Sequence, residues 1–444
     1  MMELKNSMIL GLKFRNFKSY RDEAEFSFHA LSNDALPGNY TSVELSDGTI
    51  ERVLHTAVVL GANASGKSNV VQAFHALNYM VRYSRDFGRG NDIEAYEPFA
   101  FDERSEVCSV EIEVEVATVS GRFKYEIAYN KKAVTKETLF SIMGEREKML
   151  FQREGDAANL FHRISFGSGW NHPIPEWASM DLMGNHLLLS EISSKQAYEL
   201  NDVYDALAYI NAFVSRVNMK TINDNIAPQI IKSSNTELFK RLVRMIQVAD
   251  LGIQNMEMIR HSDEEFHIPD FVSEDQRRRM IEENRWEFQM LHKYIDKDRR
   301  ESGRSWDLRK ESAGTRNLLG VGAVILGVLE MGSLLVYDEL NIALHPEITR
   351  LLINLFQDPE ANPNHAQLLF TTHDASLIGE SLLRADQVWI SEKDDIGCSH
   401  LYSIQDFEDV PIIPPMEQWY RAGRFGGLPK INNVHYIFSG EVTE

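Results

Sequence analysis

Apolar residues along this chain follow two different periods, and the switch between them is clearest near residue 60. Residues 56–60, Thr-Ala-Val-Val-Leu, form a short apolar run rich in β-branched side chains, which predicts a buried strand. Glycines follow, and the apolar positions after Ser68 then take helical spacing, at Val70, Val71, Phe74, Leu77 and Val81. The pattern predicts a strand, a glycine-rich loop and a helix in direct succession.

Three further segments alternate apolar and polar residues, which is the period of a strand with one solvated face. Residues 9–17 are the first, with residues 25–28 as the expected hairpin partner. Residues 107–129 turn at Ser120-Gly121 and predict an antiparallel meander, which we expect as an appended sheet because it does not fit alternating strands and helices. Residues 285–309 predict a β-hairpin.

Residues 318–336 are almost all apolar and about long enough to cross a bilayer. Glu330 lies within the run, and Gly332 sits where a helix C-cap belongs. We therefore expect a buried helix that leads into a buried strand, and no membrane span. Further buried strands are expected at residues 367–372, 387–391 and 400–404. This order of strands and helices predicts an α/β fold.

The middle of the chain, residues 177–272, carries apolar residues at mixed helical spacing. No heptad pattern persists there, which argues against an extended coiled coil. We expect a compact, mainly helical lobe inserted between two halves of the α/β fold.

The net charge of −20 disfavours a surface that coats DNA, because phosphate binding needs basic patches. Basic clusters at residues 277–279 and 297–309 are interpreted as solvated faces, with local nucleic-acid contact as the alternative. Cys108 and Cys398 are far apart and no C-x-x-C occurs, so a cysteine zinc site is not expected. Both thiols should be reduced in a cytoplasmic protein, and the N-terminus lacks the apolar core of a signal peptide.

The glycine loop has the spacing of a phosphate-binding P-loop, Gly61-x-x-x-x-Gly66-Lys67-Ser68. Backbone N–H groups and the positive end of the following helix would face the phosphates of ATP. Lys67 adds a charge over the β- and γ-phosphates, and the Ser68 hydroxyl is a ligand for Mg²⁺. A glycine turn with a chance Lys-Ser pair is the alternative, and the correct flanks disfavour it. The expected binding residues are Gly61, Ala62, Asn63, Ala64, Ser65, Gly66, Lys67, Ser68 and Asn69.

Catalytic candidates follow the next two buried strands. Asp338 ends the strand at residues 333–337 and is expected to hold the water shell of Mg²⁺, while the adjacent Glu339 is expected to act as general base. His373 follows the strand at residues 367–372, where a neutral imidazole could hydrogen-bond the γ-phosphate or the attacking water.

Ser312 and Gly314 come directly before the long apolar helix. Ser312 is a plausible helix N-cap, and Gly314 permits close approach of backbone. An ordinary helix start is one interpretation. The other is a second phosphate-binding helix terminus that is supplied to a neighbouring subunit.

The segments FRNFKS, GANASGKSN, ESAGTRN, LLVYDE, LHP and TTHD together resemble an ATP-binding cassette head of the SMC and RecF type. More closely, they resemble the bacterial AAA/ABC-like ATPases of the RloA-like group, which are related to the ATPase subunits of phage-defence systems such as PARIS and Septu and to the ATPase part of OLD-family nucleases. The resemblance covers both ends of the chain and the middle only by its layout.

This resemblance implies a site shared by two subunits. Ser312 and Gly314 would contact the γ-phosphate of ATP bound to the opposite subunit, and residues 344–346 would face that partner. Arg15, Asn16 and Phe17 would lie near the adenine and the phosphates. No glutamine stands where the family has its Q-loop, and residues 96–99 occupy the comparable region.

We expect an N-terminal ATPase lobe with the P-loop and the meander (1–150), a helical insertion (151–284), a C-terminal ATPase lobe with the signature, Walker B and histidine loop (285–412) and a tail (413–444). The expected function is ATP hydrolysis in a homodimer or higher oligomer that regulates a separate effector, a nuclease, in anti-phage defence. The alternatives are a DNA repair or recombination ATPase that binds nucleic acid directly, and a scaffold with a degenerate site.

Overall fold

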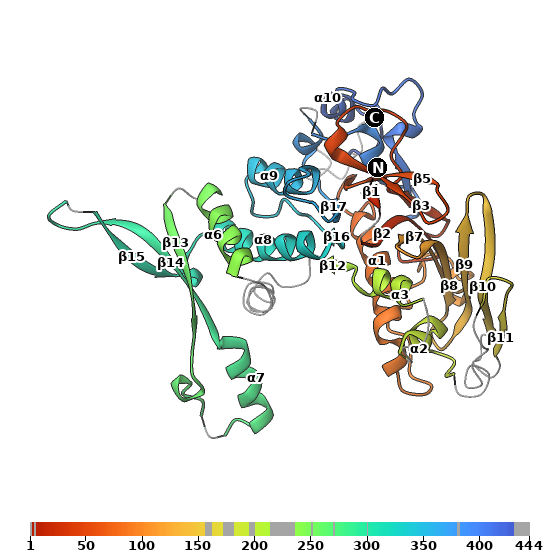
Figure 1. Ribbon diagram of the computed structural model, residues 1–444, viewed down its shortest axis with the longest axis horizontal. Helices are drawn as coiled ribbons and strands as arrows, with labels where there is room; N and C mark the ends of the chain where they lie inside the picture. Colours follow the sequence, from red (N-terminus) through yellow and green to blue (C-terminus); the bar gives the residue numbers. More distant parts are fainter. Residues whose placement is uncertain are drawn as a thin grey trace, which may run out of the picture.

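The structure is a computed structural model of the full chain, drawn in Figure 1. It describes residues 2–3, 6–155, 162–171, 182–194, 200–213, 236–249, 252–269, 271–299, 301–379 and 382–429.

A six-stranded sheet forms the centre of the ATPase-like core. Its order is β12 (Asn211–Phe213), β16 (Leu334–Tyr337), β17 (Gln367–Thr371), β6 (Thr56–Leu60), β18 (Val388–Lys393) and β19 (Ser399–Ser403). The first five strands run parallel, and β19 runs antiparallel to β18. The predicted strands of this sheet are confirmed. The expectation of helix at residues 211–213 was wrong, because pairing with β16 outweighs the local helical pattern.

Helices cover both faces of this sheet. Side chains at alternate positions of β6 belong to different cores: Ala57 and Val59 pack with α1 (Lys67–Tyr83), whereas Val58 and Leu60 pack with α8 (Ala313–Met331) and α9 (Pro346–Gln357). Both faces are therefore buried, which explains the continuous apolar runs of the parallel strands.

The helix α8 is the apolar stretch whose length suits a membrane. Among the described helices it alone passes a test of length and hydropathy, with 78% of its apolar window buried inside the molecule. Ser312 caps its N-terminus, and Gly332 ends it at a φ of 66°. The predicted buried helix that leads into a buried strand is confirmed.

A second, seven-stranded sheet is antiparallel. Its order is β11 (His162–Phe166), β10 (Arg146–Gly155), β9 (Val134–Met143), β8 (Gly121–Tyr129), β7 (Val110–Thr118), β2 (Met8–Arg15) and β3 (Ala24–Ser27). The predicted meander and N-terminal hairpin are confirmed, and they belong to one sheet. The meander starts at residue 110 rather than 107, because residues 105–107 form a 3₁₀ turn that leaves Val107 exposed. The boundary expected at residue 150 falls inside β10.

The middle of the chain does not form a lobe of its own in the described residues. The helices α2 (Leu188–Ser194) and α3 (Asn201–Ala208) pack beside α1, and α6 (Thr236–Ala249) packs on α8. Residues 253–260 form the strand β13 instead of the expected helix. Each of these helices packs its apolar face on a helix that is distant in sequence. The spacing of apolar residues predicts the helix but not the surface on which it packs. Residues 172–181 and 214–235 of the predicted lobe lie outside the described residues.

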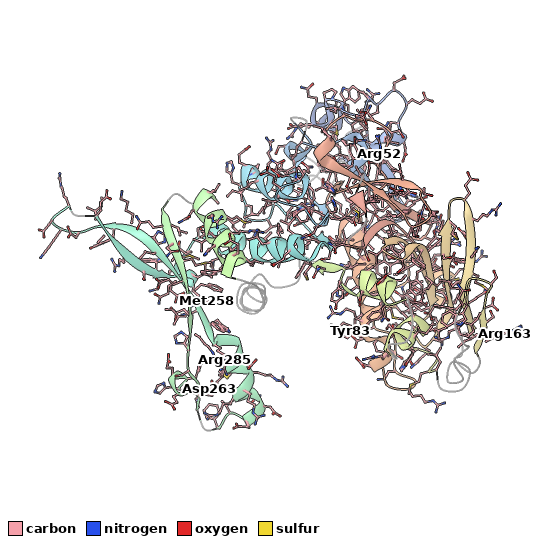
Figure 2. The ribbon with its side chains drawn as sticks, in the orientation of Figure 1. Arg52, Tyr83, Arg163, Met258, Asp263 and Arg285 are labelled. Carbon is pink, nitrogen blue, oxygen red and sulfur yellow. The ribbon has the colours of Figure 1, made fainter. Side chains whose placement is uncertain are left out.

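An arm projects from the core on the side of α6 (Figure 1). It consists of β13 (Ile253–Arg260), β14 (Trp286–Ile295) and β15 (Glu301–Asp307) in one antiparallel sheet, with α7 (Glu274–Asn284) inserted between the first two. The predicted hairpin β14–β15 is confirmed. Figure 2 shows Asp263 and Arg285 close together on the arm, where they form an ion pair of 2.9 Å.

The start of the expected tail is part of the core. The helix α10 (Met416–Arg421) packs on the 3₁₀ turn at residues 375–378, and Tyr420 and Phe425 are buried. Residues 430–444 lie outside the described part of the chain. A small fourth sheet, β1 (Met2–Glu3), β4 (Tyr40–Glu44) and β5 (Ile50–Leu54), completes the described architecture.

Candidate nucleotide site

The glycine loop leaves β6 and enters α1 without a side-chain cap. Gly66 is the N-cap residue at a φ of 115°, and because glycine has no side chain it offers no side-chain acceptor to the first N–H groups of the helix. A Cβ at this position would come within 2.5 Å of Ser399 Oγ. Only glycine therefore fits here, and the helix terminus keeps N–H groups and a positive dipole for an anion.

Lys67 closes the loop on itself. Its Nζ donates hydrogen bonds to the carbonyl oxygens of Gly61 and Ala62, at 2.8 Å each. Burial lowers the pKa of Lys67, while the nearby carboxylates of Glu339 and Asp338 act to raise it. The fold thus brings the P-loop lysine close to Glu339, the predicted general base, and Asp338, the predicted magnesium-site residue, although both are more than 270 positions away in the sequence.

Three serines, Ser19, Ser391 and Ser399, form hydrogen bonds that hold the glycine loop in place. The Ser65 carbonyl accepts hydrogen bonds from Ser391 Oγ at 3.0 Å and from Ser399 Oγ at 2.6 Å. Ser19 Oγ accepts from Asn69 Nδ2 at 2.6 Å and bonds Ser399 Oγ at 2.7 Å. Sequence reasoning missed these serines as site residues. Ser19 belongs to the FRNFKS segment, which was the one available signal.

Of the residues expected near adenine, Asn16 and Phe17 have their described contacts within the antiparallel sheet and its loops. Asn16 is buried and its amide donates to carbonyl oxygens within residues 105–109, while Phe17 is fully buried in the core. Arg15 is exposed at the end of β2. The described bonds of this loop reach the P-loop through Ser19 instead. The side chains of Asn16 and Phe17 thus help to fix the shape of the loop, and their place near adenine stays a prediction.

Asp338 and Glu339 share one hydroxyl. Thr371 Oγ1 donates to Asp338 Oδ1 at 2.6 Å and accepts the N–H of Glu339 at 2.8 Å. Glu339 has a φ of 54°, a left-handed conformation that this hydrogen bond helps to hold. Thr371 ends β17 in the TTHD segment and was not singled out from the sequence.

The second carboxylate oxygen of Asp338 suits a metal-bound water. Asp338 Oδ2 is buried and has no hydrogen-bond partner among the described residues. An unpaired buried carboxylate oxygen is unfavourable unless a ligand or water satisfies it. Asp338 and the Ser68 hydroxyl, in the first turn of α1, thus fit the Mg²⁺ that accompanies a nucleotide.

His373 lies two residues beyond β17 and is exposed. Because β17 is between β16 and β6, its carboxyl end lies between the Walker B carboxylates and the P-loop. Ligands of open α/β sheets bind at this edge. The position of His373 is therefore compatible with contact to a bound γ-phosphate.

The predicted signature residues lie at the start of α8. Ser312 is exposed, and its Oγ accepts the N–H of Thr315 at 3.0 Å. A Cβ on Gly314 would come within 3.0 Å of the Ala343 carbonyl, in the loop that follows Walker B. No described hydrogen bond joins Ser312 or Gly314 to the P-loop of the same chain.

The loop after Walker B ends in residues 344–346. Leu344 is buried, His345 is exposed and caps α9, and Pro346 is the first residue of that helix. In the Q-loop region, Glu97 forms an ion pair of 2.5 Å with Lys18. That pair ties the region to the loop that carries Ser19.

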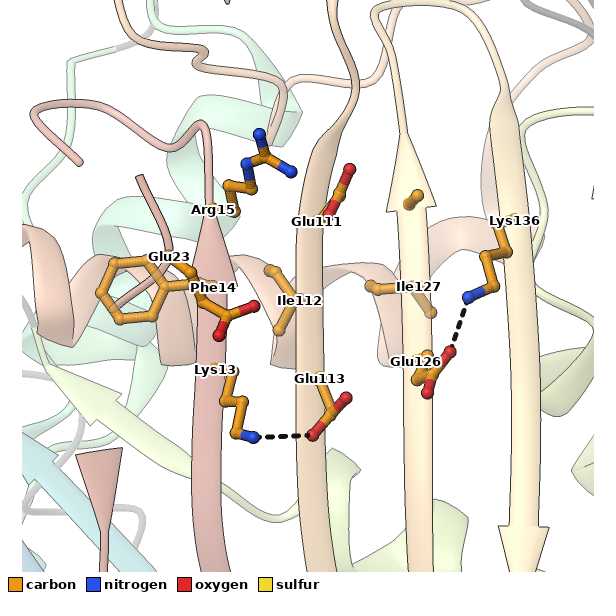
Figure 3. A pocket seen from close by; sticks show the side chains of 11 residues that line it. Lys13, Phe14, Arg15, Glu23, Glu111, Ile112, Glu113, Glu126, Ile127 and Lys136 are labelled. Carbon is orange, nitrogen blue, oxygen red and sulfur yellow. Dashed lines mark hydrogen bonds and ion pairs between the residues drawn. The ribbon is translucent and has the colours of Figure 1, made fainter. Parts of the chain in front are cut away.

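A separate hollow of about 280 Å³ lies on the solvated face of the antiparallel sheet (Figure 3). Lysines on the two outer strands, β2 and β9, flank glutamates on the two inner strands, β7 and β8. Lys13 pairs with Glu113 at 3.8 Å, and Lys136 pairs with Glu126 at 2.7 Å. We interpret this surface as a ladder of ion pairs rather than a ligand site.

The fold and this site define a P-loop nucleotide-binding protein of the AAA type. The family model described as "AAA domain, putative AbiEii toxin, Type IV TA system" matches residues 57–379, and the chain belongs to this family. No curated protein matches the chain in sequence.

Solved SMC heads are similar in structure at low sequence identity. One is the SmcHead bound to the C-winged helix domain of ScpA, with a TM-score of 0.45, 13% identity and coverage of 89% of this chain and 97% of that chain. The SMC head domain from Thermotoga maritima has a TM-score of 0.38, 13% identity and coverage of 89% and 98%. The Smc head domain with a coiled coil and joint from Pyrococcus yayanosii has a TM-score of 0.41, 10% identity and coverage of 94% and 99%.

Proposed function

We propose that this chain binds ATP with Mg²⁺ at the carboxyl edge of the parallel sheet and hydrolyses it. The observation that carries the proposal is the convergence of Lys67, Asp338 and Glu339, in which the lysine occupies the loop and a carboxylate oxygen is left unpaired. Catalytic, metal-binding and phosphate-binding groups of an ATPase need this proximity.

Each group has a defined task in this proposal. Lys67 exchanges the Gly61 and Ala62 carbonyls for the β- and γ-phosphates, and the N–H groups at the start of α1 hold the remaining phosphate oxygens. Ser68 and Asp338 hold the Mg²⁺, which supplies charge neutralisation at the phosphates. Glu339 accepts the proton of the attacking water, and His373 donates a hydrogen bond to the γ-phosphate.

Ser312 and Gly314 complete the site from a second copy of the chain. The support is that Ser312 is exposed at a helix N-terminus and has no described bond to its own P-loop. A helix N-terminus is suited to an anion. ATP would then hold two copies together, and its hydrolysis would release them.

The assembled ATPase would regulate a separate effector, a nuclease, in anti-phage defence in the cytoplasm. The family description names a toxin of a toxin–antitoxin system, which supports a role in defence. The sequence segments that resemble the RloA-like group, PARIS and Septu support the same role. The described residues contain one group of convergent metal ligands outside the nucleotide site, and no acidic nuclease centre is among them.

Glu339→Gln tests the ATPase and the assembly together. The amide cannot accept the proton of water, so ATP should stay bound and hold a closed dimer that light scattering detects, whereas the unmodified chain with ADP should be smaller. Lys67→Ala is the matched control, and it should bind no ATP and stay open. A Glu339→Gln chain that turns ATP over at the normal rate would refute the assignment.

The effector is tested with the same variants. The closed Glu339→Gln chain should retain a specific host nuclease in a pull-down, and Lys67→Ala should retain it in a different amount. A purified chain that degrades DNA or RNA unaided, with activity that survives Lys67→Ala, would contradict the separate effector.

One observation favours a second candidate, direct nucleic-acid binding. On the hairpin β14–β15, the Arg304 guanidinium lies 5.5 Å from the Tyr294 ring and 5.8 Å from the Trp306 ring, and Lys310 Nζ lies 5.5 Å from Trp306. Cations beside exposed aromatic rings suit single-stranded nucleic acid. Salt-dependent binding of an oligonucleotide that is lost in Arg304→Glu would support this candidate.

A further inference from the structure

The turn between β18 and β19 brings three different metal-ligating side chains together. Donor atoms of Asp394, Cys398 and His400 all lie within 4.8 Å of one another. Cys398 directly precedes β19, and His400 is the second residue of that strand. Of the residues that the structure describes, no other group of three such ligands converges in this way.

The backbone of the turn holds the first two ligands in place. Asp394 Oδ1 accepts the N–H groups of Ile396 at 3.0 Å and of Cys398 at 2.8 Å, and the Asp394 N–H donates to the Cys398 carbonyl at 2.9 Å. Gly397 takes the left-handed conformation that the turn requires, at a φ of 85°. The second oxygen, Asp394 Oδ2, is thereby left to face His400 Nε2 at 3.3 Å.

Although the cysteine spacing gave no reason to expect a zinc site, we propose that Asp394, Cys398 and His400 bind one Zn²⁺ ion, in a site separate from the Mg²⁺ of the nucleotide. A thiolate, an imidazole and a carboxylate form a ligand set that suits zinc and does not suit Mg²⁺ or Ca²⁺. Cys398 loses its thiol proton to solvent when the Zn–S bond forms. A water molecule fills the fourth position of the tetrahedron.

The side chains can close around an ion of this size. Zinc bonds of about 2.0–2.3 Å require the donors to approach one another by roughly 1 Å. The His400 side chain is 49% exposed and has room to rotate, while the Asp394 side chain is 34% exposed. Cys398 is fully buried, which gives the metal a fixed anchor away from water.

A metal ion at this site would restrain the β18–β19 hairpin, which contacts the P-loop through Ser399. Ser399, between Cys398 and His400, bonds the Ser65 carbonyl and Ser19 Oγ, and Gly66 packs against it. An ion that fixes the hairpin therefore restrains the loop that surrounds the phosphates. We assign the metal this structural role, without a part in the chemistry of ATP hydrolysis.

The chain supplies its own control in Cys108, the other cysteine, which is exposed and belongs to no such group in the described residues. Untagged full-length protein, free of nucleotide, is stripped with a chelator, loaded with Zn²⁺ and desalted. Mass spectrometry of the metal should find about one zinc per chain in the unmodified protein and in Cys108→Ser. Cys398→Ser and His400→Ala should each retain less than about a fifth of that amount.

Co²⁺ gives a second readout, because a cobalt–thiolate bond absorbs in the near ultraviolet, and this band should vanish in Cys398→Ser but remain in Cys108→Ser. His400 is exposed, so His400→Ala keeps the test decisive even where the change at Cys398 prevents folding. Unmodified protein that retains no zinc, or folded Cys398→Ser and His400→Ala that retain as much as it does, would overturn the proposal. Because no nucleotide is present, either result leaves the proposed ATPase untouched.

Discussion

The six-stranded sheet, in which five strands are parallel, and the seven-stranded antiparallel sheet differ in where their charged side chains lie. Both faces of the parallel sheet are covered, so its charged residues collect in the loops at the carboxyl edge, as Lys67 and Asp338 do. The antiparallel sheet has a solvated face that carries charges along the strands, such as Lys136 and Glu126, in pairs.

Buried carboxylates show the same contrast. Asp338, at the edge of the parallel sheet, keeps one oxygen without a partner among the described residues. Glu137, inside the antiparallel sheet, accepts hydrogen bonds from the Tyr125 hydroxyl at 2.7 Å and from the N–H groups of Leu188 and Leu189 at 2.6 and 2.9 Å. It also lies 3.9 Å from Arg153. The first carboxylate is prepared for a ligand, and the second already has its partners within the chain.

Because of this difference, we expect substitutions in one sheet to affect mainly activity and substitutions in the other to affect mainly stability. A change at an unpaired group of the parallel edge should reduce activity at little cost in stability. A change at a paired group of the antiparallel sheet should do the reverse.

The largest effect is expected from Glu137→Ala. The change leaves Arg153 buried without its carboxylate and three donors without an acceptor, so the free energy of unfolding should fall by about 3–5 kcal/mol. Urea unfolding followed by circular dichroism measures this. Glu126→Ala, on the solvated face of the same sheet, is the control and should cost less than about 1 kcal/mol. Equal losses in the two variants would remove the contrast.

Asp338→Asn should reduce activity strongly and change stability little. The amide keeps the shape of the side chain but is a poor magnesium ligand, so the ATPase rate should fall by at least about 100-fold, or about 2.7 kcal/mol. The free energy of unfolding should change by less than about 1 kcal/mol, because a buried charge with an unpaired oxygen is removed. Asp358→Asn, at an exposed turn after α9, should preserve the rate. A large loss of stability in Asp338→Asn would contradict the division.

Thr371→Val examines a residue that positions both catalytic carboxylates. Valine has the same shape but lacks the hydroxyl that links Asp338 to the N–H of Glu339, so the rate of hydrolysis should fall about tenfold. Thr371→Ser restores the hydroxyl and should restore most of the rate. A loss in the rate constant with an unchanged Michaelis constant for ATP would distinguish this positioning role from general damage.

The smallest effects concern two histidines whose contributions to the free energy of unfolding depend on pH in opposite directions. Hydrogen bonds to Glu115 and Glu51 raise the pKa of His29, beside the antiparallel sheet, from 6.5 to about 9. Its contribution to stability is therefore complete below pH 6.5 and disappears as the pH rises to about 9. Because its side chain is 35% exposed, solvent screening reduces the contribution to about 1 kcal/mol.

Burial lowers the pKa of His55, beside the parallel sheet, from 6.5 to about 4. The neutral form is required in the folded state, so this stability is present above pH 6.5 and is lost as the pH falls to about 4. Melting temperatures of His29→Gln and His55→Gln across pH 4–9 measure both. The difference from the unmodified protein should shrink at high pH for His29 and at low pH for His55, and identical pH profiles would contradict the assignment.

The local parts of the site were predictable because their signal lies in adjacent residues. The strand, loop and helix around Lys67 were predicted from the change of period and the glycine spacing, and Asp338 from an apolar strand that ends in a carboxylate. Thr371 and Ser19 were missed as contributors because a hydroxyl in a strand or loop has no distinctive spacing, and its value here comes from partners more than 30 positions away.

The middle of the chain shows the limit of local patterns. Residues 211–213 and 253–260 lie in segments with apolar residues at helical spacing, yet each forms a strand beside a partner strand that is distant in sequence or separated by α7. Local propensity is a weak preference that long-range pairing and burial outweigh.

The sequence by itself determined the α/β class, the succession of the main strands along the chain and the chemistry available at their carboxyl ends. These depend on apolar period, glycine conformation and residue type, which act within a few positions. Only the tertiary structure decided which groups meet. It placed Thr371 between Asp338 and Glu339, seated the serines behind the P-loop and distributed the middle helices over separate layers. Those outcomes depend on buried contacts between distant segments, whose free energy no local window of sequence contains.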